Sequence, residues 1–121
     1  MKFLLDTNFL MIPGKFKHDI FVSLSKFGYP EFYTIDLVRQ ELMLLAQKGG
    51  MDGAHAKLAL ELIKMNNVSV LPSITKKADS EILRVAKGYT VCTNDKELIK
   101  KLKKKEVPVV ILKQRKILEM L

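Results

Sequence analysis

The sequence predicts an α/β fold, a three-layer α/β/α sandwich built around a mostly parallel central sheet. Short apolar segments that suit buried strands alternate along the chain with longer segments of helical periodicity, and this alternation is typical of parallel sheets. The chain has 121 residues, of which 48% are hydrophobic. A chain of this length and composition can fold around one core, so we expect a single domain over residues 1–121.

The strands are predicted from short apolar runs bounded by turn residues. Residues 2–5 form the first such run, which suits a strand buried on both faces. The segment 8–14 is expected to be a loop, because Pro13 and Gly14 interrupt regular structure. Later strands are expected at residues 32–35, 68–71, 89–93 and 107–112.

The helices are predicted where apolar residues recur at helical spacing between capping residues and glycines. Asp36 is expected to cap a helix that ends at Gly49, and Thr75 to cap a helix that ends at Gly88. The predicted helices cover residues 18–26, 36–48, 52–66, 75–87 and 95–105, with a terminal helix at 114–121.

The composition excludes several classes of protein. The apolar runs are far shorter than the roughly 20 residues that span a bilayer, and the first residues do not follow a signal-peptide pattern. The single cysteine, Cys92, excludes an internal disulfide framework and a cysteine-based zinc site. We therefore expect a cytoplasmic protein without a membrane partner.

The net charge of +8 favours a polyanionic partner such as RNA, with simple solubility as the alternative explanation. Basic residues are concentrated between positions 96 and 116. They could contact an RNA backbone without reading its sequence, or they could form an ordinary solvated face. The candidates for backbone contact are Lys100, Lys101, Lys103, Lys104, Lys105 and Arg115.

Two aspartates directly follow predicted strands. Asp6 comes after the strand at 2–5, and Asp95 comes after the strand at 89–93. Because the carboxyl ends of parallel strands share one edge of the sheet, where open α/β folds bind ligands, both side chains are expected at one site. The alternative for each is a turn or cap role, although Thr93 or Asn94 could cap the second helix instead.

Two further acids fall on apolar helix faces. Glu41 lies within an arc of leucine and valine residues, and Asp79 lies in a similar arc of leucine, isoleucine and alanine. Burying a carboxylate is unfavourable unless it is paired or binds a metal, so both are candidate ligands. The alternative for Glu41 is a partly buried acid that pairs with a lysine or a backbone donor. Glu81, by contrast, is expected at the surface beside Lys77 and Arg84.

Acids that converge repel one another, and a divalent cation would relieve that repulsion. Oxygen ligands without histidine or cysteine favour Mg²⁺ or Mn²⁺. The candidate catalytic residues and ligands are Asp6, Glu41, Asp79 and Asp95. Glu97 is an auxiliary candidate ligand, with a favourable position in the helix dipole as its alternative role.

Four segments resemble, in order and spacing, the motifs of PIN-domain nucleases. They are Phe3-Leu4-Leu5-Asp6-Thr7-Asn8-Phe9, the helix containing Glu41, Ala78-Asp79-Ser80-Glu81-Ile82-Leu83 and Val91-Cys92-Thr93-Asn94-Asp95-Lys96-Glu97-Leu98. The resemblance covers nearly the whole chain. It is greatest to archaeal and eukaryotic PIN proteins that process small-subunit ribosomal RNA, with VapC-type toxins as the next relatives. Those processing enzymes often carry two adjacent aspartates in the third motif, where the second position here is Ser80.

This resemblance implies an endoribonuclease that depends on Mg²⁺ or Mn²⁺, cleaves single-stranded RNA to 5′-phosphate and 3′-hydroxyl ends, and often forms homodimers. A role in ribosomal RNA processing would bring ribosome-assembly factors as partners. Three polar residues are expected to orient the acids or bound waters from behind, unless they only cap turns: Thr7, Asn8 and Thr93.

Two other functions are compatible with the sequence. One is a VapC-type toxin ribonuclease that an antitoxin controls, and the other is a non-catalytic RNA-binding or ribosome-assembly protein that retains the fold. A haloacid-dehalogenase-type phosphatase also begins with an aspartate at a strand end. That class requires a second aspartate at position 8, where this chain has Asn8, so we discount it.

Overall fold

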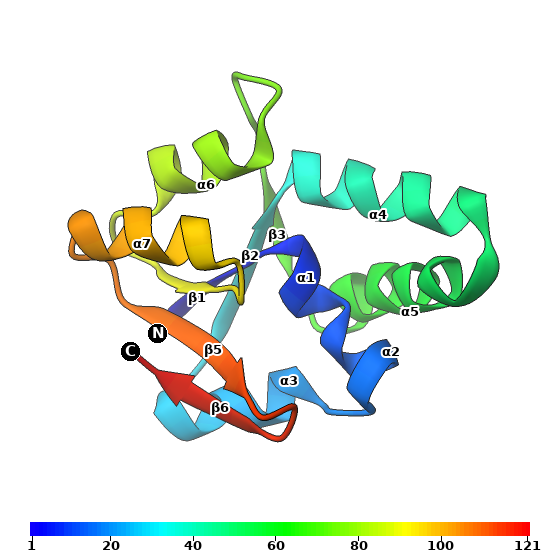
Figure 1. Ribbon diagram of the computed structural model, residues 1–121, viewed down its shortest axis with the longest axis horizontal. Coiled ribbons are helices and arrows are strands. Elements are labelled where there is room, and N and C mark those ends of the chain that lie inside the picture. The colour runs from blue at the N-terminus through cyan, green and yellow to red at the C-terminus, as the bar shows by residue number, and fades with distance from the viewer.

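The computed structural model describes residues 1–121 and contains one six-stranded sheet in the order β3-β2-β1-β4-β5-β6 (Figure 1). Strands β1 to β5 are parallel, and β6 runs antiparallel to β5 at the edge. The predicted α/β sandwich with a mostly parallel sheet is therefore confirmed. The strands are β1 (Lys2–Leu5), β2 (Glu31–Ile35), β3 (Ser69–Leu71), β4 (Thr90–Cys92), β5 (Val109–Lys113) and β6 (Ile117–Met120).

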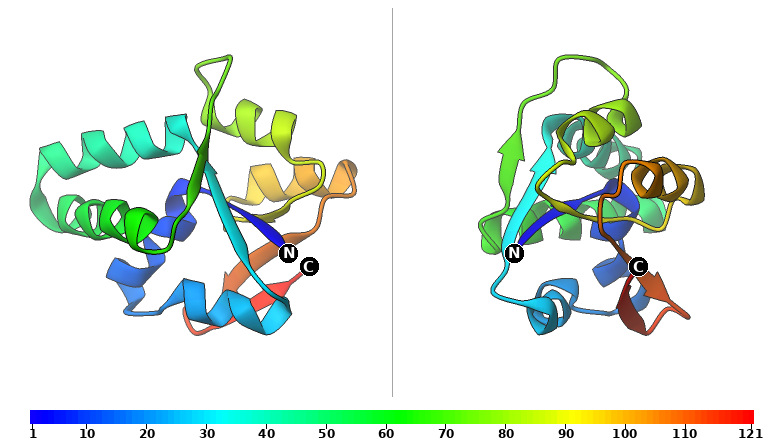
Figure 2. Two further views of the ribbon diagram at one scale, coloured as in Figure 1. Left: turned by 180° about the vertical axis from the view of Figure 1, so that it is seen from behind. Right: turned by 90° about the vertical axis from the view of Figure 1, so that its left-hand side faces the viewer.

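Helices cover both faces of the sheet (Figure 2). Helices α6 and α7 pack against each other on one face, where α6 contacts β2 and α7 contacts β5. On the other face the ring of Phe21 in α3 meets Phe32 of β2 edge-on, with 4.9 Å between ring centroids. The helices are α1 (Thr7–Leu10), α2 (Ile12–Phe16), α3 (Ile20–Leu24), α4 (Asp36–Lys48), α5 (Gly50–Met65), α6 (Ala78–Val85) and α7 (Lys96–Lys104). None of them is long and apolar enough to cross a membrane.

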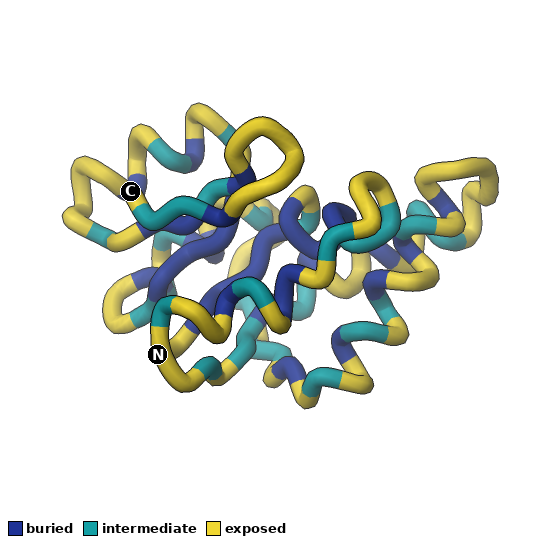
Figure 3. Tube along the Cα trace, turned by 90° about the horizontal axis from the view of Figure 1, so that it is seen from below, coloured by how far each residue is buried: buried dark blue, intermediate teal, exposed yellow.

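Strand β1 lies at the centre of the hydrophobic core. Its residues Phe3, Leu4 and Leu5 are completely buried, and buried positions run along the sheet while exposed ones follow the loops and outer helix faces (Figure 3). The hydroxyl of Thr34 on β2 donates to the carbonyl oxygen of Leu5 at 2.7 Å, so the one buried polar group beside this end of β1 is paired.

The strand order creates a switch point between β1 and β4. The chain passes outward from β1 to β2 and β3, and then crosses back to continue on the other side with β4 and β5. In open α/β sheets this arrangement leaves a crevice at the carboxyl ends of the two strands on either side of the switch. Asp6 and Asp95 follow those two strands.

Helices α4 and α5 form a long hairpin beside this crevice, and they pack closely together. Gly53 of α5 is buried against α4, where a Cβ atom would lie only 3.1 Å from the carbonyl oxygen of Leu45. A residue without a side chain at this position therefore lets the two helix backbones approach each other.

Two predictions of local structure were wrong. The expected loop at 8–14 forms two short helices, because Pro13 occupies the first turn of α2, where its missing N–H is tolerated. The expected helix at 114–121 is instead a turn followed by β6. The alternation of Leu118 toward the core with more exposed neighbours is the period of a strand.

Helix α6 begins at Ala78 rather than at Thr75, and Glu81 explains the difference. Glu81 is only 1% exposed, so its expected surface position was wrong. Its carboxylate accepts hydrogen bonds from the backbone N–H of Ile74 and from both the N–H and the hydroxyl of Thr75, and it pairs with Arg84 at 2.9 Å. The expected pair with Arg84 is present. The carboxylate of Glu81 also anchors the loop before α6, so Glu81 is a buried structural residue.

Candidate active site

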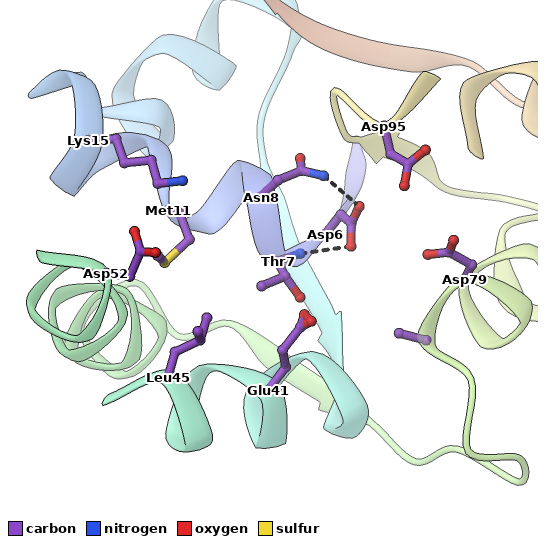
Figure 4. Close-up of a pocket in the computed structure, with 11 residues that line it drawn as sticks. Asp6, Thr7, Asn8, Met11, Lys15, Glu41, Leu45, Asp52, Asp79 and Asp95 are labelled. Carbon is purple, nitrogen blue, oxygen red and sulfur yellow. Dashed lines mark hydrogen bonds between the residues drawn. The ribbon is translucent and has the colours of Figure 1, made fainter. Parts of the chain in front are cut away.

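A cavity of about 300 Å³ opens at the switch point between β1 and β4. All four candidate catalytic acids line it, although they come from four separate segments of the chain (Figure 4). Asp6 and Asp95 enter from the ends of β1 and β4, while Glu41 and Asp79 enter from α4 and α6. The sheet edge and two crossover helices thus bring together residues as far as 89 positions apart in sequence.

Asp6 forms the floor of this cavity, and it is 5% exposed. One carboxylate oxygen accepts a hydrogen bond from the backbone N–H of Thr7 at 2.8 Å, which makes Asp6 the cap of α1. The other oxygen accepts from the hydroxyl of Thr93 at 2.7 Å and from the Asn8 amide at 3.2 Å. These contacts fix the carboxylate in one orientation before any ligand binds.

Asn8 and Thr93 also join the β1 and β4 loops to each other. The side-chain oxygen of Asn8 accepts from the backbone N–H of Asn94 at 3.1 Å, and the Thr93 hydroxyl oxygen accepts from the backbone N–H of Asp95 at 3.1 Å. Because Thr93 is completely buried, its hydroxyl has no alternative partner in solvent. The two residues therefore hold Asp6 and the start of α7 in register.

Asp95 is the cap of α7, and its neighbours do not replace it in that role. One carboxylate oxygen accepts from the backbone N–H groups of Glu97 and Leu98, at 2.9 and 3.1 Å. Asn94 instead pairs with Leu112 of β5 through its side-chain amide, in both directions at 2.8 Å. The cap uses one oxygen of Asp95, while the residue still lines the cavity.

Glu41 and Asp79 form the walls of the cavity, and both are exposed. The expectation that they lie on core-facing helix surfaces was wrong: the core face of α4 is formed by Val38 and Leu42, whereas Leu44 is 61% exposed. Neither carboxylate has a hydrogen-bond partner within the chain. Figure 4 shows both side chains directed toward Asp6 from opposite helices.

Burial and neighbouring negative charges raise the pKa values of Asp6 and Asp79. Burial raises the pKa of Asp6 above its usual 3.8, against the hydrogen bonds from Thr93 and Thr7, and the charges of Asp79 and Glu41 add to the increase. Desolvation also raises the pKa of Asp79, with Asp95 as the strongest charged contributor. These contributions place the negative charges of Glu41, Asp79 and Asp95 close enough to act across the cavity.

Several other residues line the cavity that the sequence did not single out. They are Met11, Lys15, Leu45, Asp52 and Ala78. Asp52 is a fifth carboxylate, contributed by the first turn of α5, and Lys15 brings a positive charge from α2. Their positions depend on how the α4–α5 hairpin folds back onto α2, which no local sequence pattern reveals.

The remaining candidate residues lie around the cavity. Thr7 and Asn8 line it directly, whereas Thr93 contributes through its hydrogen bond to Asp6. Glu97 is exposed and does not line the cavity. The positive charge of Lys101 lies close enough to Asp79 to offset part of the increase in its pKa. The other basic candidates are exposed: Lys100, Lys103, Lys104, Lys105 and Arg115.

The donor set of this cavity suits a hard divalent cation. It consists of carboxylate, amide and hydroxyl oxygens, which Mg²⁺ and Mn²⁺ prefer. The buried hydroxyl oxygen of Thr7 has no hydrogen-bond partner, and such an atom is expected to bind a water or an ion. No three carboxylates lie close enough to hold one ion directly.

The chain is similar to two archaeal ribonucleases over most of their lengths. It is 33% identical to ribonuclease VapC4 of Methanocaldococcus jannaschii, with 94% of this chain and 92% of that protein covered. It is also 33% identical to ribonuclease VapC9 of Archaeoglobus fulgidus, with 92% and 82% covered.

Solved structures show the same architecture. The PIN-domain endonuclease Utp24 matches 98% of this chain and 90% of its own, with a TM-score of 0.81 and 27% identity. A domain from Methanocaldococcus jannaschii, of 19% identity and TM-score 0.66, shares the fold over 93% of this chain and 91% of its own.

The model of a family described as a PIN-like domain matches residues 3–115, which include all four candidate catalytic acids. With this match, the similarity to two ribonucleases and the acidic cavity at the switch point, the chain belongs to the family of PIN-domain nucleases.

Proposed function

We propose that this protein is a divalent-metal-dependent endoribonuclease that hydrolyses single-stranded RNA, with ribosomal RNA processing as its setting. The convergence of four carboxylates on one cavity of a strongly basic domain carries this proposal. An acidic cavity repels a polyanion unless cations neutralise it, so the pocket suits an ion and the surrounding lysines suit the RNA backbone.

One or two of the four acids would hold Mg²⁺ or Mn²⁺ directly, with Asp6 as the fixed ligand, and the others would act through bound water. A bound ion supplies Lewis-acid activation of the phosphodiester and of water at the site. Thr93, Thr7 and Asn8 hold the carboxylate of Asp6 in one orientation. Because the carboxylate is already oriented, it would not have to reorganise when a ligand binds.

Glu41 and Asp79 are suited to positioning the attacking water. Their carboxylates have no partner within the chain, and each is directed into the cavity. The raised pKa of Asp79 makes its carboxylate a better proton acceptor than an ordinary surface aspartate. Lys101 lies near Asp79, where its positive charge would attract the phosphate on that side.

The proposal is tested by cleavage of an end-labelled single-stranded RNA with Mg²⁺, Mn²⁺ or EDTA. We expect cleavage with either ion, none in EDTA, and loss of activity in Asp6→Asn and Asp95→Asn. Glu61→Gln, the same chemical change at an exposed position outside the cavity, is the matched control and should cleave normally. Cleavage that survives Asp6→Asn, or no cleavage with any divalent ion, contradicts the proposal.

A second candidate is a toxin ribonuclease held inactive by an antitoxin. The similarity to two VapC ribonucleases and a set of exposed apolar residues on the α4–α5 hairpin favour it: Met43, Leu44, Met51, Leu58 and Met65. Exposed apolar side chains gathered on one hairpin suit contact with a protein partner. Growth arrest on expression of the chain that Asp6→Asn relieves would support this function, and normal growth would exclude it.

A further inference from the structure

A second group of basic and aromatic residues lies beside the acidic cavity, on the side away from α6. It is formed by two segments far apart in sequence, residues 15–17 at the end of α2 and residues 113–116 in the turn between β5 and β6. Lys15 lines the cavity itself, and Figure 4 shows it on the opposite side of the pocket from Asp79. This group thus faces Lys101 across the four acids.

The two segments meet at Phe16 and Arg115. The guanidinium carbon of Arg115 lies 5.3 Å from the centroid of the Phe16 ring, and Phe16 is 37% exposed. Stacked aromatic and guanidinium groups are the surfaces on which proteins hold the bases of single-stranded RNA. Since Arg115 is exposed as well, the pair is accessible to a base from solvent.

The turn that carries Arg115 is anchored to the floor of the cavity. Leu112, the residue before the turn segment, exchanges two hydrogen bonds of 2.8 Å with the side chain of Asn94. Asn94 in turn donates its backbone N–H to Asn8, which contacts Asp6. The position of the turn is therefore tied to the position of the catalytic carboxylate.

The turn adopts a backbone conformation that its residues do not favour. Gln114 and Arg115 have φ values of 54° and 60°, as the two central residues of a type I′ turn do, and the N–H of Lys116 donates to the carbonyl oxygen of Lys113 at 3.1 Å. Asn-Gly is the preferred pair for this turn because left-handed backbone is unfavourable for other residues. The chain has instead an arginine where glycine would be the more stable choice.

The charge around the pair also favours an anionic strand. Lys15, Lys17 and Lys116 are exposed around it, while Lys113 is paired with Glu119 at 3.4 Å. Asp52 in the cavity and Asp19, which caps α3, are the nearby acids. Three unpaired lysines and one arginine thus surround a stacking surface next to an acidic cavity.

We propose that Phe16 and Arg115 form a subsite that stacks one base of the RNA strand next to the scissile phosphate, while the adjacent lysines hold its backbone. The proposal rests on the single-stranded RNA substrate proposed above. RNA would cross the cavity from the Lys101 side to the Phe16–Arg115 side. The enzyme would then require at least one nucleotide with an intact base on this flank.

The test measures binding of a fluorescent single-stranded RNA in EDTA, which prevents cleavage. A stacked base contributes about 1–3 kcal/mol, so Arg115→Ala and Phe16→Leu should weaken binding by about five- to a hundredfold. Lys26→Ala is the matched control: it removes one exposed charge and a cation–π contact with Phe27 of 5.1 Å, in the segment between α3 and β2, which does not line the cavity. The RNA affinity of this variant should differ from that of the wild type by less than about twofold, apart from the loss that removing any one positive charge causes.

Two variants separate stacking from charge and from folding. Arg115→Lys keeps the charge but loses the planar group, and should bind nearly as weakly as Arg115→Ala. Gln114→Asn combined with Arg115→Gly gives the turn its preferred residues, and should raise Tm by about 4 °C or more while weakening RNA binding. RNA with a single abasic nucleotide should bind the wild-type chain less tightly at one position only, and bind Arg115→Ala equally at every position.

Wild-type affinity in Phe16→Leu and Arg115→Lys, or abasic RNA that binds normally at every position, overturns the subsite. Such a result leaves the nuclease proposal intact if cleavage remains sensitive to Asp6→Asn. Absence of RNA binding and of cleavage in the wild-type chain would instead contradict both proposals.

Discussion

The floor and the walls of the acidic cavity are built differently. Asp6 on the floor is buried and accepts three hydrogen bonds, from Thr7, Asn8 and Thr93. Glu41 and Asp79 on the walls are exposed, without partners, on two separate helices. The floor is thus organised before a ligand binds, whereas the walls are free to adjust to it. If the cavity holds a metal ion as proposed, Asp6 would define its position, and Glu41 and Asp79 would adjust to it.

The largest expected effect on RNA cleavage comes from replacing Asp6, the floor of the cavity. Asp6→Asn should reduce RNA cleavage by at least about a hundredfold, because even the outer partners of metal ligands are worth roughly 10–100-fold. Glu41→Gln and Asp79→Asn should reduce it less. Single-turnover rates at saturating Mn²⁺ measure the three variants side by side. Equal losses in all three would remove the distinction between floor and walls.

Thr93→Val should lower cleavage by about 10–100-fold while leaving all carboxylates in place. The substitution keeps the shape of the buried side chain but removes the hydroxyl that donates to Asp6 and accepts from Asp95. Thr90→Val, at the buried opposite end of β4, is the control for replacing threonine in this strand. Wild-type cleavage rates in both valine variants would contradict the role of the Thr93 hydroxyl in orienting Asp6.

Binding of a divalent ion should stabilise the fold. At a Mn²⁺ concentration 100 times the dissociation constant, the free energy of unfolding should rise by about 2.7 kcal/mol, and EDTA should reverse the gain. Asp6→Asn should abolish this stabilisation, whereas Glu41→Gln should only reduce it. Thermal unfolding at increasing Mn²⁺ concentration gives the result, and an unfolding temperature that never responds to the ion would count against the metal site.

Asp6 and Glu81 should affect the pH dependence of stability with opposite signs. The pKa of Asp6 is raised on folding, so its folded form binds more protons, and the stability it contributes falls as pH rises from 3.8 through the raised value. The hydrogen bond from Arg84, with those from Thr75 and Ile74, lowers the pKa of Glu81 from 4.5 to about 2. Its contribution is therefore complete above pH 4.5 and is lost as pH falls toward 2.

Denaturant unfolding in EDTA between pH 2 and pH 7 measures both contributions. Asp6→Asn should be relatively more stable than wild type at neutral pH, with the difference vanishing below pH 3.8. Glu81→Gln should be destabilised at neutral pH, and its deficit should shrink as pH falls toward 2. Parallel pH profiles for the two variants would contradict the assigned roles.

The sequence predicted the sheet and the shared edge of Asp6 and Asp95, because buried parallel strands leave a continuous apolar signal and strand ends share an edge. It could not predict how exposed Glu41 and Asp79 are. Periodicity on a helical wheel identifies an apolar arc, but it does not show that the arc faces the core, and Leu44 faces solvent.

Other errors have a similar cause. The sequence predicts a surface position for Glu81, because its pairing with Ile74 and Thr75, seven and six residues earlier, depends on the conformation of that loop. Residues 114–121 combine charged and apolar residues, so their strand character depends on the neighbouring β5 rather than on local preference. Asp52 lines the cavity because of the way the α4–α5 hairpin packs, and such tertiary packing leaves no local pattern in the sequence.

The close approach of α5 to α4 at Gly53 bears on how this enzyme could diverge. Leu45, whose carbonyl oxygen a Cβ at Gly53 would meet, also lines the cavity one turn beyond Glu41. A methyl group there would push α4 sideways by a few tenths of an ångström and carry Glu41 with it. The width of the pocket is thus adjustable from a position outside it, and under the proposed function this would change the preference between ions of different radius. Natural variation at such a spacer could retune ion selectivity while every catalytic carboxylate stays unchanged.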